Sequence, residues 1–155
     1  MITAKVPLRI SFFGGGTDIP LFYKKNNYGC VLSSSINKYL YISVKKHANF
    51  FNEKYRLNYS ISETCNNLND IQNNIFRETI KYFNIKDNLY ISTISDAPSS
   101  SGLGSSSALI VGLFMIFNKM YNLKFSKKKI IEEAAQFEIN KISKSIGKQD
   151  HYSTF

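Results

Sequence analysis

The chain has few of the residues that build metal centres and disulfide frameworks. Among its 155 residues there are two cysteines and two histidines. Cys30 and Cys65 form neither a metal-ligand spacing nor a disulfide framework. A zinc site needs several converging ligands, and no further histidine, cysteine or carboxylate supports one; His47 is expected at the surface or at a strand end. These shortages favour a protein of the reducing cytoplasm.

Long hydrophobic runs are also missing. The longest apolar stretch, residues 108–117, is too short to cross a bilayer, and no charged leader with a cleavage site opens the chain. Hydrophobic residues make up 43% of the sequence and charged residues 20%, which excludes a disordered chain as well as a membrane protein. We therefore expect one cytoplasmic domain with a single core and no membrane partner.

Positive charge exceeds negative charge, with a formal net charge of +9. Such an excess can serve nucleic acid, an anionic membrane surface or a phosphorylated small ligand. The lysines stand in short groups at residues 24–25, 45–46 and 127–129. Groups of this size are typical of solvated faces, so charge alone does not choose between these partners.

Residue patterning predicts an α+β domain. β-Branched and aromatic residues, together with alternation, predict strands at residues 4–13, 29–35, 38–44, 55–61 and 89–94, with a turn near Ile36 and Asn37. Helical spacing predicts helices at residues 68–83 and 106–121, and a third that Ser126 caps. Strands come first and helices later, which favours α+β over a doubly wound sheet.

A loop rich in glycine and serine, residues 96–108, lies between the last strand and an apolar helix. Gly102 and Gly104 allow backbone angles closed to other residues and a close approach to a ligand. The free N–H groups of a helix N-terminus suit phosphate, and serine hydroxyls can bind Mg²⁺. The composition alone fits a flexible linker equally well. The loop has neither the lysine of a Walker A motif nor the last glycine of the dinucleotide fingerprint.

Residues 98–108 resemble the ATP-binding motif of the GHMP kinases, a family that includes galactokinase, homoserine kinase and mevalonate kinase. That family usually has alanine where this chain has Ser107. The resemblance implies ATP and Mg²⁺ as cofactors. It assigns ATP binding to Pro98, Ser99, Ser101, Gly102, Leu103, Gly104, Ser105, Ser106 and Ser107.

Residues 7–18 are similar to the first motif of the same family. Galactokinase-like members have a Glu-His pair where this chain has Gly15 and Gly16, and the form seen here resembles the D-glycero-D-manno-heptose 7-phosphate kinases. The resemblance implies that Arg9 is catalytic, beside the transferred phosphate, and that Gly15, Gly16, Thr17 and Asp18 bind the sugar. Taken alone, the segment could equally be a β-turn with a solvent-facing Asp18.

Residues 147–152 resemble a third segment, Gly-Lys-Gln-Asp-Gln-Tyr, with His151 in place of the second glutamine. The resemblance implies that Asp150 is the catalytic carboxylate, and that a glutamate on the preceding helix binds Mg²⁺ together with Ser106. Glu138 is the candidate for that glutamate. The alternatives are that Glu138 is a surface residue and that Asp150 only caps a turn beside Gly147.

The resemblance spans residues 4–155. It implies the two-layer α+β fold of domain 2 of ribosomal protein S5, with residues 1–155 as the N-terminal ATP-binding domain and a C-terminal kinase domain missing. The expected function is ATP-dependent phosphorylation of a sugar or sugar phosphate, D-glycero-D-manno-heptose 7-phosphate first. The alternatives are a fucokinase-like sugar kinase, an inactive truncated remnant, and, less favoured, a basic S5-like module that binds nucleic acid.

Overall fold

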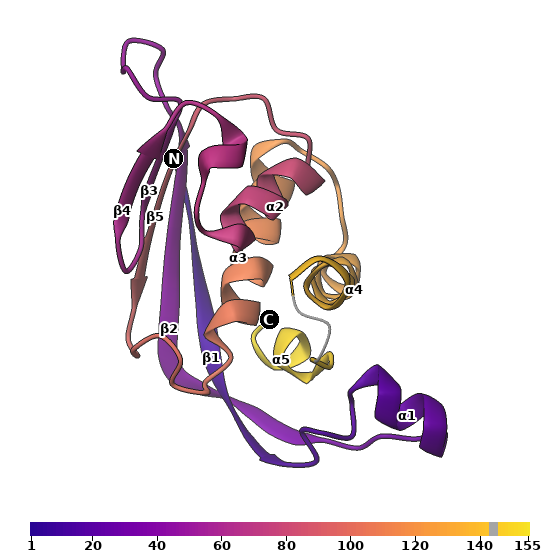
Figure 1. Cartoon of the computed structure of the whole chain (residues 1–155). Helices are drawn as coiled ribbons and strands as arrows, with labels where there is room; N and C mark the ends of the chain where they lie inside the picture. Colours follow the sequence, from indigo (N-terminus) through magenta and orange to yellow (C-terminus); the bar gives the residue numbers. More distant parts are fainter. Residues whose placement is uncertain (143–145) are drawn as a thin grey trace.

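The computed structural model describes residues 1–142 and 146–155, which form one sheet covered by a layer of helices (Figure 1). The strand order is β1-β2-β5-β3-β4, and all neighbours are antiparallel except β3 and β5, which run parallel. The strands are β1 (Ile2–Phe13), β2 (Leu32–Lys46), β3 (Tyr55–Asn58), β4 (Ser62–Cys65) and β5 (Leu89–Ser95).

The helices α2 to α5 lie on one face of the sheet, whereas α1 stands apart at the far end of the long β1–β2 hairpin (Figure 1). This arrangement confirms the predicted two-layer α+β class. No helix within residues 1–142 and 146–155 has the length and apolar character to span a membrane. The helical segments are α1 (Pro20–Asn26), the 3₁₀-helix η1 (Leu68–Asp70), α2 (Asn74–Tyr82), α3 (Ser105–Met120), α4 (Lys127–Phe137), the π-helix η2 (Glu138–Ile142) and α5 (Gln149–Ser153).

The apolar helix α3 lies directly on β1 and β2, and a glycine makes this contact possible. A Cβ atom added to Gly112 would lie 2.3 Å from Cδ1 of Ile42 and 3.0 Å from Cγ2 of Val6. Ile42 and Val6 are themselves buried in the core. The missing side chain thus lets the helix approach the sheet closely, and this approach sets the position of the loop before the helix.

Aromatic rings join α3 to its neighbouring helices. Phe114 on α3 contacts Phe83, just after α2, with ring centroids 4.7 Å apart, and Phe137 at the end of α4 with centroids 5.5 Å apart. Phe114 is fully buried. Because Phe137 precedes Glu138, this packing also determines where the Glu138 side chain enters the interior.

The two strands predicted for residues 29–35 and 38–44 are one continuous strand, β2, so the predicted turn at Ile36 and Asn37 was wrong. The pairing with β1 is instead irregular here, because Pro7 pairs with Tyr39 and Arg9 with Ser35. β2 therefore carries extra residues opposite Leu8. A bulge of this kind bends the strands and can redirect a side chain, and it lies immediately beside Arg9.

The single helix predicted for residues 68–83 is also wrong in detail, since it is divided into η1 and α2. Ile71 is fully buried in an extended conformation, and Asn73 caps α2 by accepting hydrogen bonds from the N–H groups of Ile75 and Phe76. By contrast, the predicted cap at Ser126 is confirmed, because its side chain accepts from Lys129 N. The short elements β4, α1 and α5 were not predicted.

His47 does lie just beyond the end of β2, but it is buried rather than on the surface. Only 5% of the residue is exposed. Its ring stacks on Phe51 with centroids 4.2 Å apart, and Nε2 lies 3.3 Å from Oε1 of Glu53. It is therefore a structural histidine of the loop between β2 and β3.

We expect Gly112→Val to lower the free energy of unfolding by about 1–3 kcal/mol, the usual cost of overpacking a filled core. The new methyl groups would have to displace Ile42 or push α3 away from β1. Urea denaturation measures the effect. Gly16→Ala is the matched control, because nothing lies within 4 Å of a Cβ atom added there. Equal stability of both variants would contradict the close packing of α3.

Candidate active site

The loop before α3 ends in a helix N-terminus whose N–H groups are available. Gly102 and Gly104 have φ angles of 73° and 76°, which favour glycine because a Cβ atom would be strained there. The first hydrogen bond within α3 runs from Ala108 N to Gly104 O. The N–H groups of the first turn therefore have no acceptor in the helix, and a helix dipole there favours an anion.

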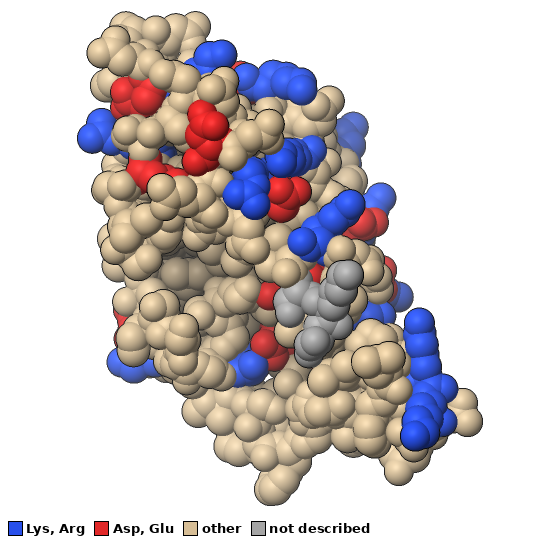
Figure 2. All heavy atoms as spheres, in the orientation of Figure 1, with Lys and Arg blue, Asp and Glu red and all other residues tan. Residues whose placement is uncertain are grey.

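A cleft of about 490 Å³ opens beside this loop, and a hollow is visible on this face of the molecule in Figure 2. One part of its wall is apolar and comes from Leu40, Ile75 and Leu109. Its volume lies in the usual range for small-molecule sites. The polar part of the wall comes from Ser60, Asn73, Thr93, Ser95, Ser99, Ser100, Ser105 and Ser106.

The Arg9 guanidinium joins the loop to α5. Nε donates to Oδ1 of Asp150 and Nη2 donates to Oδ2, both at 2.7 Å, which makes a bidentate ion pair. Nη1 donates to the carbonyl oxygen of Gly102 at 2.5 Å. The Arg9 backbone N–H also donates to Leu103 O at 3.0 Å. A guanidinium has five N–H donors, so two remain without a bond among the described residues.

A second carboxylate, that of Glu138, is buried behind the same loop, with only 3% of the residue exposed. Ser106 Oγ donates to Oε1 at 2.6 Å, and Ser107 Oγ donates to Oε2 at 2.7 Å. Nε2 of His151 lies 2.8 Å from Oε2, at ion-pair distance but not in line for a hydrogen bond. Glu138 is therefore an interior residue, and the alternative of a surface glutamate is excluded.

The surroundings of Glu138 keep it ionised. Burial raises its pKa, but His151 and the hydroxyls of Ser106 and Ser107 together outweigh burial and hold the pKa below its ordinary value. An anionic carboxylate beside an exposed serine hydroxyl is a suitable pair of ligands for a hard cation such as Mg²⁺. The described residues contain no group of three histidine, cysteine, aspartate or glutamate side chains that could hold a metal.

The Asp18 carboxylate is held against the segment before α5. Gln149 N donates to Oδ2 at 2.7 Å. A Cβ atom on Gly147 would overlap that carboxylate, since it would lie 2.0 Å from Oδ2. Oδ1 of Asp18 is buried and has no partner among residues 1–142 and 146–155. Asp18 is thus not a solvent-facing turn residue, and the hydrogen-bonding capacity of Oδ1 is unused among the described residues.

The other residues of the predicted sugar site have different surroundings. Thr17 Oγ1 donates to Gly14 O at 2.8 Å or to Cys30 O at 2.7 Å, and it accepts from Cys30 N at 2.8 Å. This side chain is therefore occupied in closing the turn. Gly15 lies against the Gln149 amide, and Gly16 has open space around it.

The predicted ATP-binding residues all lie on the loop or in the first turn of α3, but they face different ways. Ser99, Ser105 and Ser106 line the cleft, whereas Ser107 is buried and turned to Glu138. Pro98 and Ser101 are exposed on the loop, outside the cleft wall. The fold thus brings the cleft, the Arg9–Asp150 pair and Glu138 together around one helix N-terminus.

Two residues beside Asp150 contribute more than sequence reasoning assigned to them. Gln149 accepts from Ser11 Oγ at 3.0 Å through Oε1, in addition to its backbone bond to Asp18. His151 is fully buried against Glu138. The signal for them was their place in the motif of residues 147–152; the contacts themselves could not be predicted, because each joins residues that are far apart in the sequence.

Comparison with known proteins identifies relatives of this chain. Residues 49–155 match the model of the GHMP kinases N terminal domain. The D-glycero-alpha-D-manno-heptose 7-phosphate kinase of Campylobacter jejuni subsp. jejuni serotype O:2 is 32% identical over an alignment of 161 residues. The alignment covers 98% of this chain and 47% of that protein.

Solved structures show the same fold. A putative sugar kinase from Campylobacter jejuni is 28% identical with a TM-score of 0.71, over 97% of this chain and 51% of that one. A D-glycero-D-manno-heptose 1-phosphate kinase from Bacteroides thetaiotaomicron is 23% identical with a TM-score of 0.80, over 99% and 53% of the two chains. The chain spans about half the length of these relatives. It belongs to the GHMP kinase family and has the fold of that family's N-terminal domain.

Proposed function

We propose that this chain is the nucleotide-binding half of a kinase that transfers the γ-phosphoryl group of ATP to a hydroxyl of a sugar or sugar phosphate. The observation that carries the proposal is the Arg9 guanidinium, which binds both oxygens of Asp150 and the Gly102 carbonyl of the loop. It holds a carboxylate beside a loop and helix N-terminus suited to phosphate. Phosphoryl transfer needs mainly such positioning and charge stabilisation.

The residues present suit ATP with Mg²⁺. The cleft has the volume and the partly apolar wall of a nucleoside site, and nothing lies within 4 Å of a Cβ atom placed on Gly102, so the loop leaves room for phosphate. Ser106 and Glu138 would hold Mg²⁺, which neutralises charge on the phosphates when bound. The N–H groups at the start of α3 would bind phosphate oxygens.

Asp150 and Arg9 have separate roles in this proposal. The acceptor hydroxyl oxygen forms a bond to the γ-phosphorus while the bond from that phosphorus to the oxygen bridging to ADP breaks. Asp150 orients the hydroxyl and accepts its proton. Arg9 keeps Asp150 in place, and its two remaining N–H donors can offset charge on the transferred group.

The acceptor we propose is D-glycero-D-manno-heptose 7-phosphate. The support is the similarity to the Campylobacter jejuni heptose 7-phosphate kinase and the Gly15-Gly16-Thr17-Asp18 segment. Asp18 supplies the carboxylate of that segment, and its Oδ1 has no partner among the described residues. We further propose that a C-terminal part, as long as that of the relatives, completes the acceptor side.

Nucleotide binding can be tested on the 155-residue chain itself. Ligand at 100 times its Kd stabilises the native state by about 2.7 kcal/mol, so saturating ATP with Mg²⁺ should raise Tm by roughly 5–10 °C. Gly104→Val should abolish this shift, because the added atoms strain a backbone at φ 76° and meet the Arg9 side chain. Differential scanning fluorimetry measures both.

Gly112→Val is the control, since it strains the same helix away from the loop. It should melt at a lower temperature yet keep the full ATP shift. An undiminished shift in folded Gly104→Val would remove the loop assignment.

For the catalytic carboxylate we expect Asp150→Asn to lower kcat by roughly 10²–10⁴-fold, the usual contribution of a positioned acid or base. The Kd for ATP with Mg²⁺ should change little, because the effect falls on the transition state. The assay uses the chain fused to the C-terminal half of the Campylobacter jejuni relative. Asp96→Asn is the control: Asp96 is an exposed carboxylate at the start of the loop that, among the described residues, accepts only from Tyr39 N. Near-normal kcat in folded Asp150→Asn would refute the assignment.

Acceptor choice is a separate question in the same fusion protein. Heptose 7-phosphate should show a higher kcat/KM than galactose, fucose, mevalonate or homoserine, as measured by coupled release of ADP. Equal turnover of unphosphorylated fucose or galactose would reject the heptose assignment and leave the kinase class standing. Absence of turnover with every acceptor, in a fusion that binds ATP, would favour an inactive remnant.

A further inference from the structure

The His151 side chain lies directly behind the Glu138 carboxylate. None of it is exposed, and its Nε2 is 2.8 Å from Oε2 of Glu138. Neither of its ring nitrogens has an aligned hydrogen-bond partner within residues 1–142 and 146–155, so the contact with Oε2 is one of proximity and charge. A buried imidazole this close to one carboxylate oxygen acts mainly on that carboxylate.

The two oxygens of Glu138 have different surroundings. Oε2 accepts a hydrogen bond from Ser107 and lies 2.8 Å from Nε2 of His151, and both residues are buried. Oε1 contacts Ser106, which is exposed and lines the cleft. One oxygen is therefore anchored in the interior, and the other is paired with a group that a ligand in the cleft can reach.

We propose that His151 is a positioning residue for the divalent cation that accompanies the nucleotide. It limits the movement of Oε2 of Glu138, so that Oε1 stays aligned with the hydroxyl of Ser106. The inference rests on the proposed function and adds to it a residue in contact with neither substrate. Without His151 the carboxylate could rotate about its last bond and lose that alignment. Mg²⁺ is demanding in geometry, and loss of a group that orients a ligand usually lowers metal affinity 10–100-fold.

The position of His151 in the fold extends this role. His151 and Asp150 are neighbours in the short helix α5, and His151 N bonds back to Lys148 O at 3.1 Å. Asp150 reaches Arg9, whereas His151 reaches Glu138. The short helix α5 thus fixes the relative positions of two carboxylates: that of Asp150, proposed to act on the acceptor hydroxyl, and that of Glu138, proposed to bind the cation.

The test compares His151→Gln with His151→Asn in the 155-residue chain. A glutamine amide can place a donor near the position of Nε2, whereas the shorter asparagine cannot. Calorimetric titration gives the Kd for ATP with Mg²⁺ and for ATP with a chelator. We expect His151→Asn to weaken only the Mg²⁺-dependent part of binding, by 10–100-fold, and His151→Gln to recover most of it. ATP binding under chelator should be the same in all three proteins.

His47→Asn is the matched control. His47 is also buried and also lies beside a glutamate, but at the β2–β3 loop away from the cleft residues. It should lose stability and keep the Mg²⁺ dependence. If His151→Asn does not fold, Ser107→Ala removes the other anchor of Oε2 and should give the same selective loss.

Two results would overturn the inference, and they differ. In the first, folded His151→Asn keeps the Mg²⁺ dependence of the wild-type chain, or Ser107→Ala does so where that variant replaces it. This would show that the anchoring of Oε2 does not matter for cation binding, and the proposed function would still stand. In the second, the wild-type chain binds ATP equally tightly with and without Mg²⁺. This would reject Ser106 and Glu138 as the cation site, and it would also reject the proposed role of His151.

Discussion

The site depends on one interaction, the bidentate ion pair between Arg9 and Asp150. Arg9 comes from the edge strand β1 and Asp150 from the last helix, and the same guanidinium also binds the loop carbonyl of Gly102. Arginine suits this position because its planar fork can bind two partners in fixed directions. Removal of one member of a buried pair costs about 3–5 kcal/mol because the other charge is left unpaired. Because the pair is partly exposed here, removing one member costs less stability than in a fully buried pair. The main effect is that Asp150 is no longer held in place beside the loop.

The two carboxylates of the site are oriented by different means. Asp150 is paired with a permanent cation, whereas Glu138 is held by two hydroxyls and a histidine in an almost fully buried position. Asp150 itself and His151, the neighbour of Glu138, both lie on the short helix α5.

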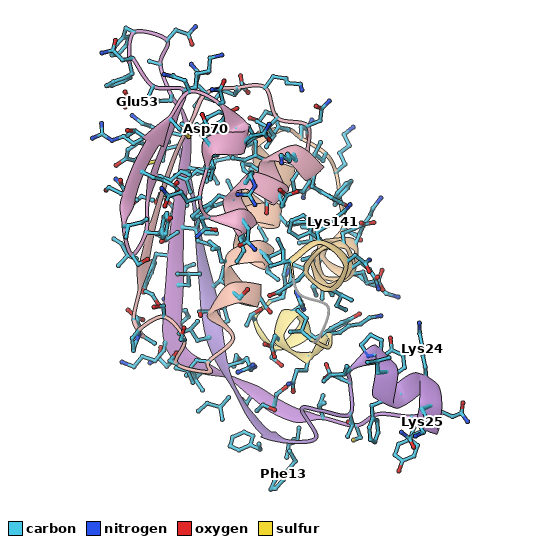
Figure 3. The ribbon with its side chains drawn as sticks, viewed as in Figure 1. Phe13, Lys24, Lys25, Glu53, Asp70 and Lys141 are labelled. Carbon is cyan, nitrogen blue, oxygen red and sulfur yellow. The ribbon has the colours of Figure 1, made fainter. Side chains whose placement is uncertain are left out.

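Charged side chains are sparse at the lower end of the view in Figure 2, where the β1–β2 hairpin extends. Phe13 projects from this end of the hairpin, whereas Lys24 and Lys25 lie on α1 at the lower right of the view (Figure 3).

Much of the fold could be predicted because its long elements have regular patterns. β1, β5 and α3 lie within one or two residues of their predicted bounds, and Ser126 caps α4 as its residue type indicates. The errors came from tertiary contacts. Burial of Ile71 stopped a helix that the periodicity favoured, and pairing with β1 kept β2 continuous through Ile36 and Asn37. α5 was missed because a helix of one turn has no periodicity to detect.

For the site, the sequence by itself determined the family, the glycine–serine loop and the chemical types of Arg9, Glu138 and Asp150, because motifs are local and residue types are carried by the chain. Only the tertiary structure decided what these groups do to one another. It turned Ser107 and His151 inward to one oxygen of Glu138, committed Thr17 to closing a turn, and left Oδ1 of Asp18 without a partner among the described residues. The contacts of Ser107 and His151 with Glu138, and of Thr17 with Cys30, join residues more than 10 positions apart. Sequence spacing carries no information about orientation across that distance. The approach of α3 to the sheet at Gly112 and the bulge beside Arg9 supply that orientation.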